Sequence, residues 1–108
     1  MNKDYFQKVY QIVSEIPKGK VTTYGLIAQA LGSKRKARVV GYALNAVIGK
    51  DIPCHRVVNR NGQLSGSIHF ATPTLMRELL EAEKITFKDN LVDLDKHLWI
   101  PKNIEVTE

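Results

Sequence analysis

The run Pro53-Cys54-His55-Arg56 holds the residues with the clearest chemical potential. A thiol acts as a nucleophile after it loses its proton, and cationic neighbours lower the pKa of a thiol. His55 and Arg56 follow Cys54 directly, so this run favours a reactive thiolate. Glu83, at the end of an expected helix, is a candidate to orient His55, which would complete a set of nucleophile, base and acid.

A structural role for this run is the alternative, because an isolated cysteine beside a histidine is more often a buried cysteine and a hydrogen-bonded histidine. Cys54 is the only cysteine, so no internal disulfide can form. One cysteine and the two other histidines, His69 and His97, fall short of a zinc-binding pattern. We therefore expect no metal and no organic cofactor.

Charge is distributed unevenly along the 108 residues, whose formal net charge is +5. Residues 17–62 hold nine lysines and arginines and a single acid, Asp51, whereas the rest of the chain holds more acids than bases. A basic central segment suits a polyanion such as nucleic acid. Charge alone is equally compatible with a solvated basic surface.

The basic segment also carries the signature of a helix-turn-helix. Thr22 or Thr23 can cap a short helix that runs through Ala30, and residues 31–33 form a Gly-containing turn. Ser33 is the expected cap of a third helix, whose buried positions are Ala37, Val40, Leu44, Val47 and Ile48.

The third helix would begin with the run Lys34-Arg35-Lys36-Ala37-Arg38. Basic residues in a first helical turn oppose the helix dipole, so helix stability gives no reason to collect them there. Contact with phosphates does give a reason. An ordinary pair of helices with exposed lysines is the alternative.

Three further elements are expected. A first helix spans about 4–16, with Asp4 as its cap and Gln7 completing the capping box, and residues 17–20 end it. Asn61-Gly62 between Val57-Val58 and Gln63-Leu64 predicts a β-hairpin. The buried positions of the first helix are Phe6, Val9, Val13 and Ile16.

Residues 65–71 have no periodicity and are expected to form a loop. Thr72 as cap and Pro73 as first helical residue would begin a fourth helix. The tail, which holds the apolar groups 85–87, 91–92 and 98–101, is expected to pack back on the core. The expected buried positions of the fourth helix are Leu75, Met76, Leu79, Leu80 and Ala82.

These elements predict one domain over residues 1–108, mainly α with a short β-hairpin, arranged as a winged helix-turn-helix. No apolar run approaches the roughly 20 residues that a membrane span requires. The polar first residues do not resemble a secretion signal. We expect a cytoplasmic protein without membrane contact.

Three ordered motifs together resemble the DNA-binding domain of the O6-alkylguanine-DNA alkyltransferases and their alkyltransferase-like relatives. They are Val-Thr-Thr-Tyr-Gly at 21–25, Ala-Arg-Val-Val-Gly-Tyr-Ala-Leu at 37–44 and Ile-Pro-Cys-His-Arg-Val-Val at 52–58. The resemblance runs from about residue 4 to 85 and implies the fold of the C-terminal domain of those enzymes.

The resemblance also implies roles for five residues. Arg38 would enter the duplex through the minor groove and fill the gap left by a flipped nucleotide, and Tyr24 would rotate the 3′ phosphate of that nucleotide. Cys54 would accept the alkyl group, His55 would activate it through a water, and Glu83 would orient His55. Flipping costs a few kcal/mol of unstacking, which these contacts would partly offset.

Two wider sets of residues are expected around these five. The expected DNA-contacting residues are Tyr24, Arg38, Thr23, Ser33, Lys34, Arg35, Lys36, Ala37 and Gly41. The expected lesion pocket consists of Pro53, Cys54, Arg56, Val57 and Ser67.

Departures from the enzyme pattern favour the alkyltransferase-like relatives. The loop at 65–72 replaces Tyr-Ser-Gly-Gly and is about two residues longer, Val47 stands where an asparagine is expected, and the segment before Pro53 is about one residue shorter. The compact length and the ending Leu98-Trp99-Ile100-Pro101 point the same way. Those relatives bind alkylated guanine without repairing it, and most have Trp or Ala where this chain has Cys54.

The leading hypothesis is therefore a monomeric sensor that binds O6-alkylguanine in double-stranded DNA and passes the site to nucleotide excision repair proteins. The alternative is a single-turnover alkyltransferase in which Cys54 keeps the alkyl group. A third hypothesis is a helix-turn-helix transcription regulator that reads undamaged DNA.

Overall fold

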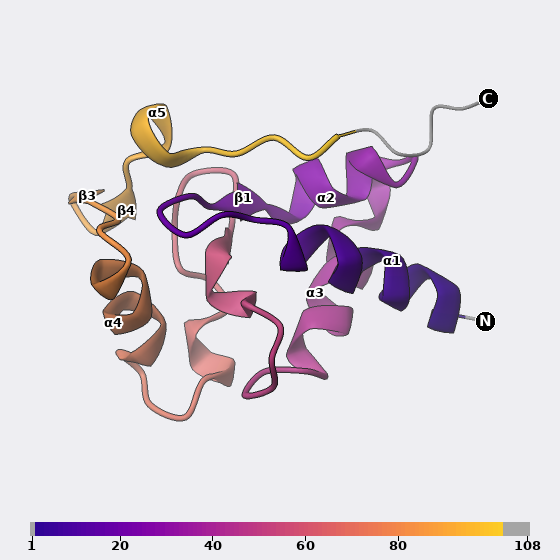
Figure 1. Ribbon diagram of the computed structural model, residues 1–108, viewed down its shortest axis with the longest axis horizontal. Helices are drawn as coiled ribbons and strands as arrows, with labels where there is room; N and C mark the ends of the chain where they lie inside the picture. Colours follow the sequence, from indigo (N-terminus) through magenta and orange to yellow (C-terminus); the bar gives the residue numbers. More distant parts are fainter. Residues whose placement is uncertain (1, 103–108) are drawn as a thin grey trace.

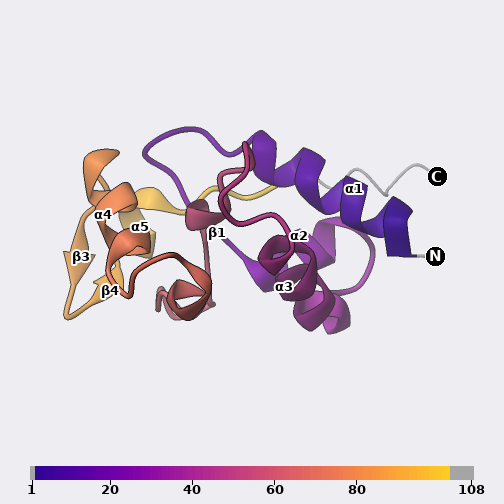
Figure 2. The ribbon, with the colours of Figure 1, turned by 90° about the horizontal axis from the view of Figure 1, so that it is seen from below.

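The computed structural model describes residues 2–102 and contains a group of three helices joined to a smaller α/β part (Figure 1). The three helices are α1 (Asn2–Ser14), α2 (Tyr24–Ala30) and α3 (Ala37–Asn45). The smaller part contains α4 (Leu75–Ala82), the strands β3 (Phe87–Lys88) and β4 (Leu91–Val92), and the short helix α5 (Leu94–His97). Figure 2 shows the two groups at opposite ends of an elongated molecule.

The helix-turn-helix forms where the caps predict it. The Thr23 side chain accepts a hydrogen bond from the Leu26 amide at 3.0 Å and begins α2. Gly32, with φ at +113°, makes the turn, and such a φ favours glycine. Ser33 then caps the 3-10 turn η1 (Lys34–Lys36), which leads directly into α3. The Thr23 cap is confirmed, whereas Ser33 caps the 3-10 turn and α3 itself begins after Lys36 without a side-chain cap.

The strands β1 (Thr22–Thr23) and β2 (Val57–Val58) are parallel neighbours, with Thr22 beside Val57 and Thr23 beside Val58. On the other side of β1, the Val21 amide donates to the His97 carbonyl and the Trp99 amide donates to the Val21 carbonyl. The C-terminal segment therefore pairs with the strand that precedes the helix-turn-helix.

The predicted β-hairpin between Val57-Val58 and Gln63-Leu64 is wrong. The Asn59 side chain accepts hydrogen bonds from the amides of Asn61 and Gln63, which closes a tight turn instead of extending a ladder. Val57 and Val58 pair with β1 instead. The antiparallel pair in the described residues is β3 with β4, joined by Asp89 and Asn90, both with positive φ.

Two buried clusters meet at the β1–β2 pair. Val57 belongs to the cluster formed with α1, α2 and α3, whereas Val58 belongs to the cluster formed with α4 and the tail. Successive side chains of a strand point to opposite faces, so two residues of β2 supply both clusters. The tail packs on the core as expected, through Ile85 and Val92 in the second cluster and Trp99 against the first.

Helix boundaries differ from expectation by a turn or less at several ends. α1 begins at Asn2, so Asp4 lies inside its first turn and is not the cap, and it ends at Ser14. α3 ends at Asn45, which leaves Val47 and Ile48 half-buried in the segment after it.

The fourth helix shows a larger difference. Thr72 and Pro73 lie in a turn, and α4 begins at Leu75. Ala82 is exposed instead of buried. The expected loop at 65–71 contains one 3-10 turn, η3 (Ser67–His69). No described helix is both long and apolar enough to cross a membrane.

Candidate functional site

Cys54 opens the 3-10 turn η2 (Cys54–Arg56), directly before β2. Its side chain is buried, and its thiol donates to the Leu44 carbonyl, with Sγ 3.6 Å from the oxygen. Burial raises the pKa of the Cys54 thiol to about 11, because the interior disfavours the charged thiolate. The expectation that cationic neighbours produce a reactive thiolate is therefore wrong for this conformation.

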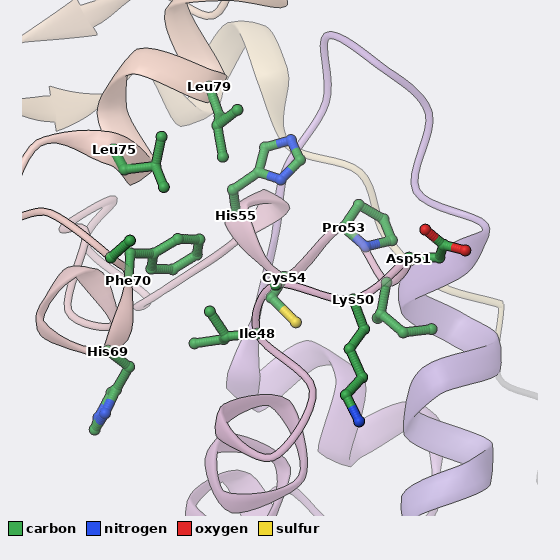
Figure 3. A pocket seen from close by; sticks show the side chains of 13 residues that line it. Ile48, Lys50, Asp51, Pro53, Cys54, His55, His69, Phe70, Leu75 and Leu79 are labelled. Carbon is green, nitrogen blue, oxygen red and sulfur yellow. The ribbon is translucent and has the colours of Figure 1, made fainter.

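The neighbouring side chains of His55 and Arg56 interact with Glu83 instead of with Cys54. His55 Nε2 lies 2.8 Å from Glu83 Oε2, and Arg56 donates from Nε and Nη2 to the two carboxylate oxygens at 2.9 and 2.8 Å. Figure 3 shows the His55 ring and the Cys54 sulfur on opposite sides of η2. The expected contact between His55 and Glu83 is present, and Cys54 lies apart from it.

Arg56 also connects the three-helix group to the α/β part. Its Nη1 donates to the carbonyl of Ile16, just after α1, at 2.8 Å, while its other donors reach Glu83 at the end of α4. Burial disfavours the charged form of Glu83, but the hydrogen bonds from Arg56 and His55 outweigh burial and hold the pKa of this carboxyl below its ordinary value. Arg56 is thus part of the scaffold behind the site.

A pocket of about 540 Å³ opens beside Cys54, between the segment that follows α3, the loop around η3 and the first turns of α4 (Figure 3). Pro53 and Cys54 line it, as expected. The remaining three expected pocket residues do not line it: Arg56 interacts with Glu83, Val57 is fully buried in the core, and Ser67 lies in η3 outside the lining.

Sequence reasoning missed most of the pocket wall. Phe70, Leu75 and Leu79 form an apolar side, and Lys50 and His69 are basic groups among the lining residues. Leu75 and Leu79 are four residues apart on α4 and half-buried, and this spacing was the available signal. The loop at 65–71 has no periodic signal in the sequence. In the structure, His69 Nε2 lies 3.3 Å from Asn45 Nδ2 at the end of α3.

The exposed surface of the helix-turn-helix carries the expected basic residues. Lys34, Arg35, Lys36 and Arg38 are all exposed. Arg38 forms no hydrogen bond or ion pair within residues 2–102, so its guanidinium is available to a ligand. A side-chain carbon at Gly41, three residues later on α3, would meet no atom within 4 Å, so the helix surface there is open to close approach.

Three other expected DNA-contacting residues have structural contacts. The hydroxyl oxygens of Thr23 and Ser33 accept cap hydrogen bonds, and Thr23 is buried. Tyr24 lies at the start of α2 and reaches the loop before η3, where a side-chain carbon at Gly66 would lie 2.9 Å from its hydroxyl. Burial raises the Tyr24 pKa, and a hydrogen bond with Ser65 opposes that shift. Ala37, the first residue of α3, is half-buried.

Among residues 2–102, no three His, Cys, Asp or Glu side chains lie close enough together to hold a metal ion. The site thus consists of a cysteine-bearing pocket at the C-terminal end of α3 and an exposed basic surface at the N-terminal end of the same helix.

Together the fold and the site define a small helix-turn-helix protein of the DNA-binding class. Residues 4–85 match the family described as 6-O-methylguanine DNA methyltransferase, DNA binding domain, and the chain belongs to this family. The DNA base-flipping protein of Escherichia coli (strain K12) is 41% identical over 97 residues, which cover 86% of this chain and 72% of that protein. Alkyltransferase-like protein 1 of Schizosaccharomyces pombe is 34% identical over 104 residues, which cover 91% and 96%.

Solved structures agree with this assignment. The S. pombe alkyltransferase-like protein, crystallised in complex with damaged DNA containing O6-carboxymethylguanine, matches with a TM-score of 0.81 at 35% identity, over 94% of this chain and 100% of that one. The Mycobacterium tuberculosis protein OGT in complex with DNA matches with a TM-score of 0.66 at 37% identity, over 78% of this chain and 52% of that one.

Proposed function

We propose that this protein binds O6-alkylguanine in double-stranded DNA and rotates the modified nucleotide out of the duplex into the pocket beside Cys54. The observation that carries the proposal is the position of this pocket at the end of α3, the helix that presents the exposed Arg38. From Arg38 to Asn45 the helix rises about 10 Å. The S. pombe relative, whose structure contains O6-carboxymethylguanine, supports the ligand class.

In this proposal α3 docks in the minor groove, and Arg38 occupies the space of the extruded nucleotide. Tyr24 rotates the adjacent 3′ phosphate. The DNA backbone is contacted by the cap residues Thr23 and Ser33, the basic residues Lys34, Arg35 and Lys36, and the small residues Ala37 and Gly41. The two small residues let the DNA backbone approach the helix closely. Flipping costs a few kcal/mol, and these charged contacts offset part of it.

The proposal favours sensing over repair because burial raises the pKa of the Cys54 thiol and the sulfur lies apart from the His55–Glu83 pair. The protein would then bind the lesion without chemistry and pass it to nucleotide excision repair proteins, acting as a cytoplasmic monomer built from a single domain, without a metal or organic cofactor. The pocket volume leaves room for alkyl groups larger than methyl.

Alkyl transfer is the second candidate, and the cysteine in the pocket wall favours it. The Cys54 sulfur would form a bond to the alkyl carbon while the bond from that carbon to O6 breaks. The thiol proton would end on the released guanine. His55, held by Glu83, would act as the base that takes the thiol proton through a water.

Intact-mass measurement after incubation with a duplex containing O6-methylguanine separates the two candidates. Sensing predicts an unchanged protein mass together with tighter binding to this duplex than to the undamaged one. Transfer predicts a gain of one methyl group, which Cys54→Ala abolishes. Equal affinity for both duplexes with no change in mass would contradict both candidates and favour a regulator of undamaged DNA.

A further inference from the structure

A second groove of about 590 Å³ lies beside the N-terminal end of α2, away from Cys54. The helix-turn-helix supplies one wall of this groove, through Tyr24 and Lys34. The turn after β2 supplies another wall, through Asn59 and Arg60, and the apolar side chains of Leu94 and Leu98 come from the C-terminal segment. No acidic residue is among the described residues that line it, so the groove is electropositive.

Strand pairing places Arg60 beside the helix-turn-helix. β1 and β2 run in parallel with Thr23 beside Val58, so the chains leave the two strands in the same direction. Tyr24 directly follows Thr23, and Asn59 and Arg60 directly follow Val58. A residue 36 positions away in the sequence therefore lies on the same groove as Tyr24.

The turn that carries Arg60 is held rigidly. The Asn59 carboxamide oxygen accepts from the amides of Asn61 and Gln63 at 2.9 Å each, and the Asn59 carbonyl accepts from Gly62. Gly62 is buried against β4, where a side-chain carbon would lie 2.7 Å from the Val92 carbonyl oxygen. The turn can thus hold a ligand-binding side chain with little loss of backbone entropy.

The Arg60 side chain itself has no protein partner. It is exposed, and within residues 2–102 it forms no hydrogen bond, ion pair or ring contact. The two other arginines in the α/β part and its junction both have partners: Arg56 binds Glu83, and Arg77 binds Glu81 and packs on Phe87. An arginine on a rigid turn, on a groove that also holds a tyrosine and a lysine and has no acid in its described lining, suits a phosphate.

We propose that Arg60 binds a backbone phosphate of the duplex that the helix-turn-helix binds, so that the DNA interface continues from α2 and α3 into the groove of Tyr24, Lys34 and Arg60. The guanidinium and the Lys34 ammonium contact phosphates, and Leu94 and Leu98 contact the apolar faces of the deoxyriboses. This inference rests on the proposed DNA binding, and it adds the turn after β2 and the segment of Leu94 and Leu98 to the residues that contact the DNA backbone.

The test measures the affinity of the full chain for two duplexes, one with O6-methylguanine and one undamaged, between about 50 and 200 mM salt. Because a phosphate contact carries no lesion information, Arg60→Ala should weaken binding to both duplexes severalfold and by the same factor. The slope of log affinity against log salt concentration, which is negative, should become shallower by about 0.9, the value for one phosphate contact. Arg60→Lys should retain most of the slope.

Lys18→Ala is the matched control, because it removes the same charge from an exposed residue between α1 and β1. Figure 2 shows this segment on the side of the molecule opposite α2 and α3. An Arg60→Ala variant with the affinity and slope of Lys18→Ala would overturn the inference. So would a variant that loses only the preference for the lesion, since that result assigns Arg60 to base recognition.

The two proposals fail in different ways. Loss of the proposed function appears as a parent protein with no preference for the O6-methylguanine duplex. Failure of the Arg60 inference appears as a parent with that preference and an Arg60→Ala variant with an unchanged slope. Binding of the parent to neither duplex would contradict both.

Discussion

Glu83 Oε2 lies 2.8 Å from His55 Nε2 and 2.8 Å from Arg56 Nη2, so one carboxylate oxygen binds two neighbouring residues of η2. The side chains of Arg56 and Glu83 are 12% and 13% exposed, which places this ion pair largely out of water. The pair joins the end of α4 to the turn that carries Cys54. It therefore fixes the position of that turn between the two buried clusters.

Glu83→Ala should lower the free energy of unfolding by about 3 kcal/mol, because it leaves the buried guanidinium of Arg56 with only the Ile16 carbonyl as a partner. Urea denaturation of the parent and the variant measures this difference. Glu81→Ala, which removes an exposed carboxylate from the same helix, is the control and should cost less than about 1 kcal/mol. Equal losses in the two variants would contradict the assignment.

Acid should weaken the same interaction. The pKa of Glu83 is lower in the folded protein than in the unfolded chain, so its contribution to stability is complete above the unfolded value of about 4.3. That contribution is lost as the pH falls through the lower folded value. The stability difference between the parent and Glu83→Gln should therefore shrink as the pH falls below about 4.3, as denaturation at a series of pH values will measure. A difference that grows in acid would reverse the sign and refute the assignment.

The Cys54 thiol should react slowly with alkylating reagents at neutral pH. With its pKa raised to about 11, the rate of modification by iodoacetamide should rise about tenfold per pH unit from neutral pH without levelling off near 8.5, where an ordinary free cysteine does. The control is the same protein in urea, where the ordinary pKa returns. A plateau between pH 8 and 9 in the folded protein would show that the thiol is more ionised than its burial allows.

Arg38→Ala and Tyr24→Ala should lose most of the preference for O6-methylguanine over guanine, because each removes a group that supports the extruded nucleotide. Fluorescence anisotropy with the two duplexes gives the ratio of affinities, and a loss of about 1.4 kcal/mol appears as a tenfold change in that ratio. Tyr24→Phe keeps the ring and tests the hydroxyl alone. Unchanged lesion affinity in both alanine variants would refute these roles.

Adjacent threonines in β1 should respond in opposite directions to the same substitution. Thr22 is fully buried and its hydroxyl has no hydrogen-bond partner among residues 2–102, so Thr22→Val should raise the free energy of unfolding by about 1 kcal/mol. Thr23→Val removes the cap of α2 and should lower it by about 1 kcal/mol. Urea denaturation measures the change in unfolding free energy for each variant. Changes of the same sign would mean that strand packing outweighs the loss of the two hydroxyl groups.

Local features of the sequence predicted the helix-turn-helix and its caps. Thr23 and Ser33 form hydrogen bonds to amides two or three residues away, so their partners are fixed by the chain itself. The spacing of Val9 and Val13 likewise predicts a buried helix face, because a helix repeats every 3.6 residues, whereas Ile16 is buried just beyond the helix end.

The strands show the opposite case. β1 and β2 are two residues long, which is too short for a pattern, and the Asn61-Gly62 signal suggested a local partner for Val57 and Val58. The actual partner lies 35 residues earlier in the sequence, and only the packing of both clusters against β2 selects it. The same pairing places Arg60 beside Tyr24.

The sequence by itself determined the helix-turn-helix, the family and the residues that could do chemistry, because these depend on near neighbours and on residue type. Only the tertiary structure decided which partners those residues contact. Arg56 and His55 are adjacent to Cys54 in the chain, yet both interact with Glu83, 27 or 28 residues away, and the thiol is left buried. Adjacency in the sequence does not determine which partner a side chain contacts. The long-range ion pair and the burial of the sulfur arise only in the folded chain.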